Sequence, residues 1–120
     1  MADRGIILFG HGSRDPLWRL PIEAVAARIA RDHGSVAVRC AFLELDRPDL
    51  PTAADELIAS GAGRITIVPM FLGTGRHARE DLPRLVMALI ERHPGVAFVL
   101  QPPVGEDARV VELLAGIALE

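Results

Sequence analysis

The sequence has 120 residues, of which 50% are hydrophobic and 24% charged, with a net charge of −3. This composition indicates one folded domain over residues 1–120 and argues against general binding to nucleic acid or anionic membranes. All 13 basic residues are Arg, and neither Lys nor Tyr occurs, which excludes lysine Schiff bases and phenolic acid catalysis. The single cysteine, Cys40, excludes an intrachain disulfide. No apolar run is long enough to span a membrane, and the first residues do not resemble a signal peptide, so we expect a cytoplasmic protein.

Short apolar runs alternate with segments of helical periodicity along the chain. We expect strands at residues 5–10, 35–45, 64–70 and 96–100. We expect helices that end near His33, Ser60, Arg92 and Leu119. Asp49 is predicted to cap the second helix, and the last helix is predicted to begin at Glu106, where acidic side chains suit the helix dipole.

Two prolines fall within the helical segments, and proline lacks the amide hydrogen that a helix interior needs. Because of Pro21, the first helix is expected either to begin near Trp18 or to bend. The third helix is expected to begin at about His77 or Asp81, with Pro83 tolerated only in its first turn.

The alternation of strands and helices predicts an α/β fold, namely a doubly wound four-stranded parallel sheet with helices on both faces. The expected strand order is 2-1-3-4, with the switch point between the first and third strands. Ligands of such sheets bind at the carboxyl ends of the strands beside the switch point. The sequence therefore directs attention to the loops at residues 10–15 and 70–80.

These two loops hold two of the four histidines. Neutral imidazole binds Fe, Co, Ni and Zn and is a general base near neutral pH, so we interpret His11 and His77 as functional, although either could simply cap its loop by hydrogen bonding. His33 and His93 are expected in the last turns of helices, where they complement the helix dipole and have a structural role.

Carboxylates also lie near the expected carboxyl edge of the sheet. Glu44 ends the second strand and could assist proton or metal transfer, or could merely be solvated. Glu80 follows His77 by three residues, so one helical face could present both, although Glu80 and Asp81 also suit a helix N-terminus.

Three arginines lie in the same loops. Guanidinium groups bind carboxylates and phosphates in a bidentate manner, so Arg14, Arg76 and Arg79 indicate an anionic ligand unless they are ordinary surface residues. Trp18 and Phe71 could form apolar walls for a flat ligand. Gly10-His11-Gly12-Ser13 matches neither the P-loop nor the dinucleotide-binding fingerprint, so a reaction here is expected to proceed without ATP.

Three parts of the sequence resemble the sirohydrochlorin chelatases of the CbiX/SirB type. They are Phe9-Gly10-His11-Gly12-Ser13-Arg14-Asp15-Pro16, then Ala41-Phe42-Leu43-Glu44, and then Val68-Pro69-Met70-Phe71-Leu72 followed by Gly75-Arg76-His77 and Glu80-Asp81-Leu82-Pro83. The resemblance covers nearly the whole chain and places both histidines in register. It implies a single class II chelatase half-module over residues 1–120, with no ATP and no permanently bound cofactor.

The resemblance implies an enzyme that inserts a divalent metal ion into sirohydrochlorin or a related tetrapyrrole, in cobalamin or siroheme biosynthesis. Co²⁺ is the expected metal, followed by Fe²⁺, with Ni²⁺ used by some relatives; the metal is a substrate. The resemblance maps the family's two histidines onto His11 and His77, which we assign to metal binding and proton abstraction. Glu44 or Glu80 could relay the proton, and we predict Glu44 as the third catalytic residue. The substrate, a flat macrocycle with eight carboxylates, is expected to contact Ser13, Arg14, Arg76, Arg79 and Phe71.

Short members of this family pair as homodimers, and a four-stranded half encloses a macrocycle poorly. We therefore expect a two-fold symmetric dimer whose interface lies near the strand carboxyl ends and includes Trp18 and Phe71.

Two other functions are open at this point. A non-catalytic carrier of a tetrapyrrole or metal would have the same site but would not accelerate metal insertion. A phosphoryl-transfer enzyme of the histidine phosphatase type is less well supported, because that family has Arg directly before the histidine, where this chain has Gly10.

Overall fold

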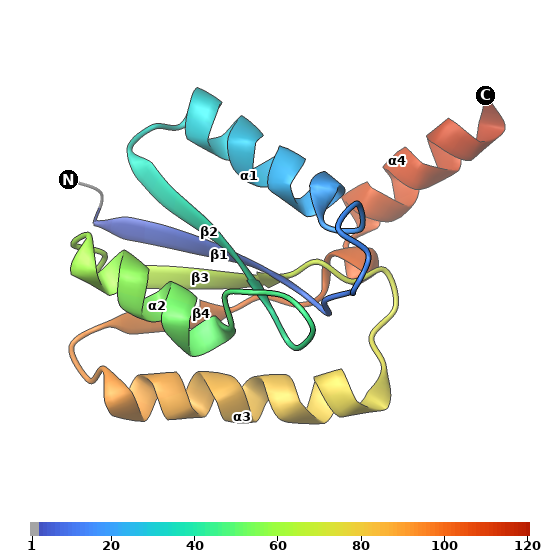
Figure 1. Ribbon diagram of the computed structural model, residues 1–120. Coiled ribbons are helices and arrows are strands. Elements are labelled where there is room, and N and C mark those ends of the chain that lie inside the picture. The colour runs from blue at the N-terminus through green and yellow to red at the C-terminus, as the bar shows by residue number, and fades with distance from the viewer. Residues whose placement is uncertain (1–2) are drawn as a thin grey trace.

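The computed structural model describes residues 3–120 (Figure 1). Strands and helices alternate along the chain as the sequence predicts. The elements are β1 (Arg4–Gly10), α1 (Leu20–Asp32), β2 (Val36–Phe42), α2 (Leu50–Ala59), β3 (Arg64–Pro69), α3 (Arg76–Arg92), β4 (Ala97–Leu100), a short 3₁₀ helix η1 (Val104–Glu106) and α4 (Ala108–Leu119). No helix within residues 3–120 combines the length and apolar character needed to cross a membrane.

The four strands form one parallel sheet in the order β2-β1-β3-β4, which confirms the predicted fold class. Strand β1 is central and pairs with β2 over its whole length, from Arg4 opposite Val36 to Gly10 opposite Phe42. On its other side Phe9 lies opposite Pro69, the last residue of β3. Because β1, β2 and β3 end in register, the loops that follow them emerge at the same edge of the sheet.

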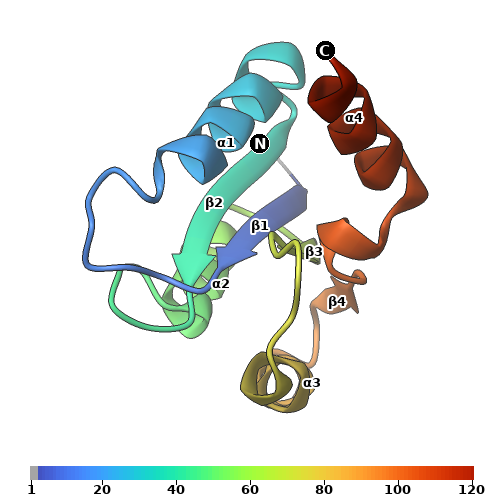
Figure 2. The same cartoon turned by 90° about the vertical axis from the view of Figure 1, so that its right-hand side faces the viewer.

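Alternate residues of the central strand supply the two cores. Ile7 and Phe9 point to the face covered by α2 and α3, where they join the larger buried cluster with Ile65 and Ile67. Leu8 points to the opposite face and packs with Ile22 of α1 and Phe42. Figure 2 shows α1 on one side of the sheet and α2 and α3 on the other.

The last helix departs from this layered arrangement. Helix α4 lies on the same side of the sheet as α1 but projects beyond the end of the strands (Figures 1 and 2). Every residue from 111 to 119 is exposed. This leaves the β3–β4 half of that sheet face without the helix that covers it in a complete doubly wound layer, and Val99 of β4 is 48% exposed.

The two helical prolines behave differently. Helix α1 begins at Leu20, so Pro21 lies in its first turn, where a missing amide hydrogen is harmless. Pro83 lies inside α3, well beyond the first turn, so the prediction that it is tolerated only there was wrong. Pro83 and Arg79, the residue one turn earlier, are both exposed. Water can therefore bind the carbonyl group that proline leaves unpaired, while Leu82 and Val86 stay buried against the sheet.

Asp49 is the N-cap of α2, as predicted. Its Oδ1 accepts a hydrogen bond from the Thr52 amide at 3.0 Å. The hydrogen bonds from Thr52 hold the pKa of Asp49 below its ordinary value. Because the folded state depresses this pKa, the cap stabilises the fold above the carboxyl group's ordinary pKa, and this contribution is lost as the pH falls through the depressed value.

Replacing the capping carboxylate tests this reading. Asp49→Ala should lower the free energy of unfolding by about 1 kcal/mol at pH 7. The difference from wild type should shrink as the pH falls below the ordinary carboxyl pKa, as measured by urea denaturation at several pH values. Asp49→Asn, which keeps a side-chain acceptor, is the matched control and should retain most of the stability at every pH. A constant deficit of Asp49→Ala down to strongly acidic pH would show that the ionised cap is not responsible.

Candidate functional site

The loops after β1 and β2 are joined by backbone hydrogen bonds that continue the strand pairing beyond the sheet. The amide of Leu43 donates to the carbonyl oxygen of Gly10, and the amide of Glu44 donates to that of His11, both at 3.0 Å. The side chains that follow the two strands are therefore fixed relative to each other.

Gly12 allows the loops to approach this closely. Its φ is +102°, a conformation that residues with a Cβ rarely adopt. A Cβ atom on Gly12 would lie 1.6 Å from the carbonyl oxygen of Glu44, far inside van der Waals contact. Glycine is thus required both by backbone conformation and by the space between the loops.

His11 and Glu44 form a side-chain pair at this edge. His11 Nε2 lies 2.9 Å from Glu44 Oε1, and the two side chains are 52% and 56% exposed. An ionised carboxylate accepts but cannot donate, so in neutral His11 the proton lies on Nε2 and the lone pair on Nδ1. A carboxylate that orients an imidazole in this way is the usual partner of a metal-binding or proton-accepting histidine. The structure thus brings together two of the three predicted catalytic residues.

Ser13 orders the first loop. Its amide donates to Asp46 Oδ2 at 2.9 Å, and its hydroxyl oxygen accepts from the Asp15 amide at 3.1 Å. Asp46 was not predicted from the sequence, because its partner lies 33 residues earlier and no local pattern indicates such a contact.

His77 lies in the first turn of α3, at the end of the loop that follows β3. It is exposed, and no hydrogen bond or ion pair within residues 3–120 joins it to His11; what the two share is a position after neighbouring strands. Arg76 Nε is 3.2 Å from Glu80 Oε1, so within α3 Glu80 pairs with an arginine. Gly75, the N-cap, provides no side-chain cap for the first amides of the helix.

The remaining predicted substrate contacts divide into two groups. Arg14, Arg76 and Arg79 are exposed on the two loops or the first turns of α3. Phe71, in contrast, is only 8% exposed and packs edge-to-face against Phe9 with ring centroids 6.2 Å apart. The expectation that Phe71 presents its ring to a ligand is therefore not met in this chain: the ring fills the core beneath the loop.

The other two histidines lie at helix ends, as expected. His33 and His93 are the C-caps of α1 and α3. His93 Nε2 is also 3.0 Å from Asp55 Oδ1, which ties α3 to α2. Neither belongs to the edge formed by the loops after β1 and β3.

Residues 3–120 contain no group of three or more His, Cys, Asp or Glu side chains placed to hold a metal ion. The candidate metal donors are the paired His11 and Glu44, with His77 at the end of the loop after β3. So few donors from one chain suit brief binding of a metal ion better than permanent binding.

The chain has an α/β fold with a parallel sheet in the order β2-β1-β3-β4. In this class of fold, ligands generally bind beside the switch point of the sheet. The chain belongs to the CbiX family, whose family model matches residues 5–118.

Two proteins with similar sequences are named as sirohydrochlorin chelatases. The chain is 33% identical over 118 residues to the sirohydrochlorin cobaltochelatase of Methanosarcina barkeri, covering 92% of this chain and 90% of that protein. It is 34% identical to the sirohydrochlorin ferrochelatase of Bacillus subtilis, covering 91% of this chain but 42% of that protein.

Solved structures agree with the fold. A CbiX protein from Marinobacter aquaeolei superposes with a TM-score of 0.81 at 32% identity, covering 96% of this chain and 93% of that one. The sirohydrochlorin chelatase SirB from Bacillus subtilis subspecies spizizenii, in complex with cobalt, superposes with a TM-score of 0.80 at 28% identity. That match covers 97% of this chain but 49% of SirB.

Gly12 provides a test of the loop arrangement. Gly12→Ala should lower the free energy of unfolding by about 2–4 kcal/mol, because the added methyl group meets the Glu44 carbonyl oxygen. Gly73→Ala is the matched control in the loop after β3: a Cβ there has nothing within 4 Å, so stability should change by no more than about 0.5 kcal/mol. Urea denaturation measures both. Equal stability of the two variants would contradict the close approach of the loops.

Proposed function

We propose that this protein inserts a divalent metal ion into sirohydrochlorin. This is the activity after which its relatives, a sirohydrochlorin cobaltochelatase and a sirohydrochlorin ferrochelatase, are named. The single observation that carries the chemistry is the His11–Glu44 pair at the carboxyl edge of the sheet. Co²⁺ and Fe²⁺ are both compatible with imidazole ligands, so the ligand types leave the choice between them open.

Metal insertion replaces two pyrrole N–H protons of the macrocycle by one divalent ion. The Nδ1 lone pair of neutral His11 either binds the incoming ion or accepts one of the two pyrrole protons, and the Glu44 carboxylate stabilises the imidazolium that this proton transfer would form. The protons that His11 does not accept pass to water. His77 supplies a second imidazole on the adjoining loop. Two exposed imidazoles bind a divalent ion weakly enough to release it to the four nitrogens of the ring.

The substrate's carboxylates are proposed to bind at the same edge. Arg14 and Arg79 are exposed and free to form charge-assisted hydrogen bonds, and Arg76 could exchange its exposed partner Glu80 for a substrate carboxylate. The first turn of α3, whose cap has no side chain, also favours negative charge. Ser13 is better explained as a residue that orders the loop than as a direct contact.

Two histidine variants test the proposed chemistry. His11→Ala and His77→Ala should each lower the rate of Co²⁺ or Fe²⁺ insertion into sirohydrochlorin by about 100-fold or more, followed by absorbance, since each removes a group that contacts the reacting atoms. Both side chains are exposed, so thermal unfolding should be unchanged. His33→Ala at the end of α1 is the matched control and should keep the wild-type rate. Full activity of His11→Ala would contradict the assignment, and wild-type protein that binds sirohydrochlorin without accelerating insertion would indicate a carrier.

We also propose that the active form is a homodimer, held by α4 and not by the predicted contacts of Phe71. Phe71 is buried within its own chain, whereas α4 carries a row of exposed apolar side chains at helical spacing, including Leu113, Leu114 and Ile117. Burial of such side chains stabilises an interface by about 1.5–3 kcal/mol each.

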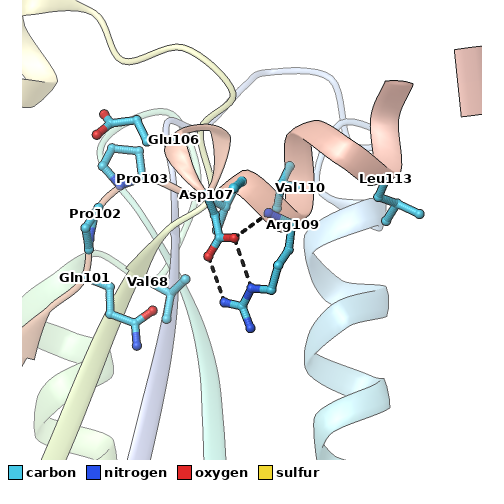
Figure 3. A pocket seen from close by; sticks show the side chains of 11 residues that line it. Val68, Gln101, Pro102, Pro103, Glu106, Asp107, Arg109, Val110 and Leu113 are labelled. Atoms are coloured by element: carbon cyan, nitrogen blue, oxygen red, sulfur yellow. Dashed lines mark hydrogen bonds and ion pairs between the residues drawn. The ribbon is translucent and has the colours of Figure 1, made fainter. Parts of the chain in front are cut away.

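A complementary surface lies at the base of the same helix. A hollow of about 740 Å³ lies between the end of β3, the segment after β4 and the start of α4. Figure 3 shows the side chains that line it. Val68, Val110 and Leu113 contribute apolar surface to it, and the ion pair of Asp107 and Arg109 lies at its side.

A second copy of the chain is the occupant that fits. Each copy offers one unpartnered apolar helix and one uncovered half of a sheet face, so a two-fold pair satisfies both copies with a single type of contact. The match to about half of SirB's length supports the same idea, because SirB has room in one chain for a second half of this size.

Sedimentation velocity tests the dimer. The wild type at micromolar concentration should sediment at about twice 12.9 kDa. Leu113→Glu combined with Ile117→Glu should yield folded monomers, because charge on the apolar side of α4 cannot be buried unpaired. Glu112→Gln, on the same exposed helix, is the control and should remain dimeric. A wild-type monomer at these concentrations, or a dimer that survives both glutamates, would refute an α4 interface.

A further inference from the structure

Arg19 immediately precedes α1 and reaches across to the loop after β2. Its Nη1 donates to the carbonyl oxygen of Arg47 at 3.0 Å and lies 3.5 Å from Asp46 Oδ1. The guanidinium carbon is 4.4 Å from the ring centroid of Phe42, which is itself buried. The Arg19 side chain is only 25% exposed, so these contacts are shielded from water more than those of an ordinary surface arginine.

Asp46 extends the contact to the histidine loop. One of its carboxylate oxygens faces Arg19, and the other accepts the amide hydrogen of Ser13 at 2.9 Å. Asp46 is 15% exposed, and its own amide donates to the carbonyl oxygen of Glu44 at 2.8 Å. The residue between, Leu45, has a φ of 66°, so the backbone turns sharply directly after Glu44.

Arg19 also lies near Glu23, but without a hydrogen bond between them. Its Nε is 3.3 Å from Glu23 Oε2, within ion-pair distance, but the N–H makes no hydrogen bond. Within residues 3–120, the side-chain hydrogen bond of Arg19 is therefore the one to the Arg47 carbonyl oxygen, in the loop that carries Glu44, and Asp46 of the same loop lies at ion-pair distance.

We propose that Arg19 and Asp46 are positioning residues that hold Glu44 against His11. Arg19 holds the loop that carries Glu44 through the carbonyl group of Arg47. Asp46 joins that loop to the loop of His11 by accepting the hydrogen bond of the Ser13 amide. This role rests on the proposed function, because His11 and Glu44 are the residues proposed to bind the metal or accept the proton. Neither residue needs to touch substrate for this effect.

The positioning has a consequence for kinetics. A carboxylate held at 2.9 Å keeps the proton of neutral His11 on Nε2, and a loosened loop would leave His11 without this partner for part of the time. Loss of a supporting partner of this kind lowers activity by roughly 10- to 100-fold. The effect is expected in kcat, with the KM for sirohydrochlorin little changed, because the exposed arginines that are proposed to bind its carboxylates are untouched.

Amide hydrogen exchange followed by NMR tests the loop contacts without substrate. In Arg19→Met, the amides of Ser13 and Glu44 should exchange roughly tenfold or more faster than in wild type, while the amide of Ile7 in β1 keeps its rate. Arg28→Met is the matched control: Arg28 lies on α1, the helix that Arg19 precedes, and pairs with Asp32, so its removal should leave both loop amides unchanged.

A parallel kinetic measurement separates the two proposals. Loss in kcat with unchanged KM in Arg19→Met, together with faster loop exchange, supports the positioning role. Unchanged exchange of Ser13 and Glu44 would overturn it even if the wild type metallates sirohydrochlorin, as would faster exchange with an unchanged kcat. A wild type without chelatase activity would refute the proposed function, while the exchange data still decide whether Arg19 holds the loops.

A second variant covers the case in which Arg19→Met fails to fold. Asp46→Asn keeps an oxygen that can accept from Ser13 but removes the charge that faces Arg19. It should show a smaller increase in exchange at Ser13 and Glu44 and a smaller loss in kcat. Wild-type behaviour of Asp46→Asn in both measurements would contradict the ion pair's part in positioning.

Discussion

The close approach of Gly12 to the backbone of Glu44 is the constraint on which the rest of the site depends. It is possible because Gly12 has no Cβ and adopts a positive φ. With the two loops in contact, the hydrogen bonds of β1 and β2 continue past the sheet, and the side chains of His11 and Glu44 meet at 2.9 Å. A histidine–carboxylate pair is thus built from backbone geometry before any ligand binds.

The same geometry explains how a small chain can offer metal-insertion chemistry. The buried strands form the floor, and the proposed reactive groups lie at its exposed carboxyl edge, where a flat macrocycle can approach. Weak binding of the ion is an advantage for an enzyme that must release it. The half-covered sheet and the exposed α4 are the features on which the proposed pairing with a second copy rests.

The fold and part of the site were predictable from the sequence because they depend on local patterns. Apolar runs that alternate with helical segments define the sheet, and the glycines beside His11 mark a loop at its edge. Arg19 and Asp46 were missed because they act on residues 28 and 33 positions away. Phe71 was assigned to the ligand because an aromatic residue at a strand end suits a core and a pocket equally, and only the packing against Phe9 decides between them.

A crystal structure of the protein with Co²⁺, with anomalous diffraction recorded at the cobalt edge, tests the central claim most directly. The account predicts an anomalous peak within bonding distance of the imidazole of His11, with His77 as a second ligand of the same ion, and no such peak at that position in crystals of His11→Ala. Cobalt bound reproducibly elsewhere, for example at His33 or His93, with His11 and His77 both free, would contradict it.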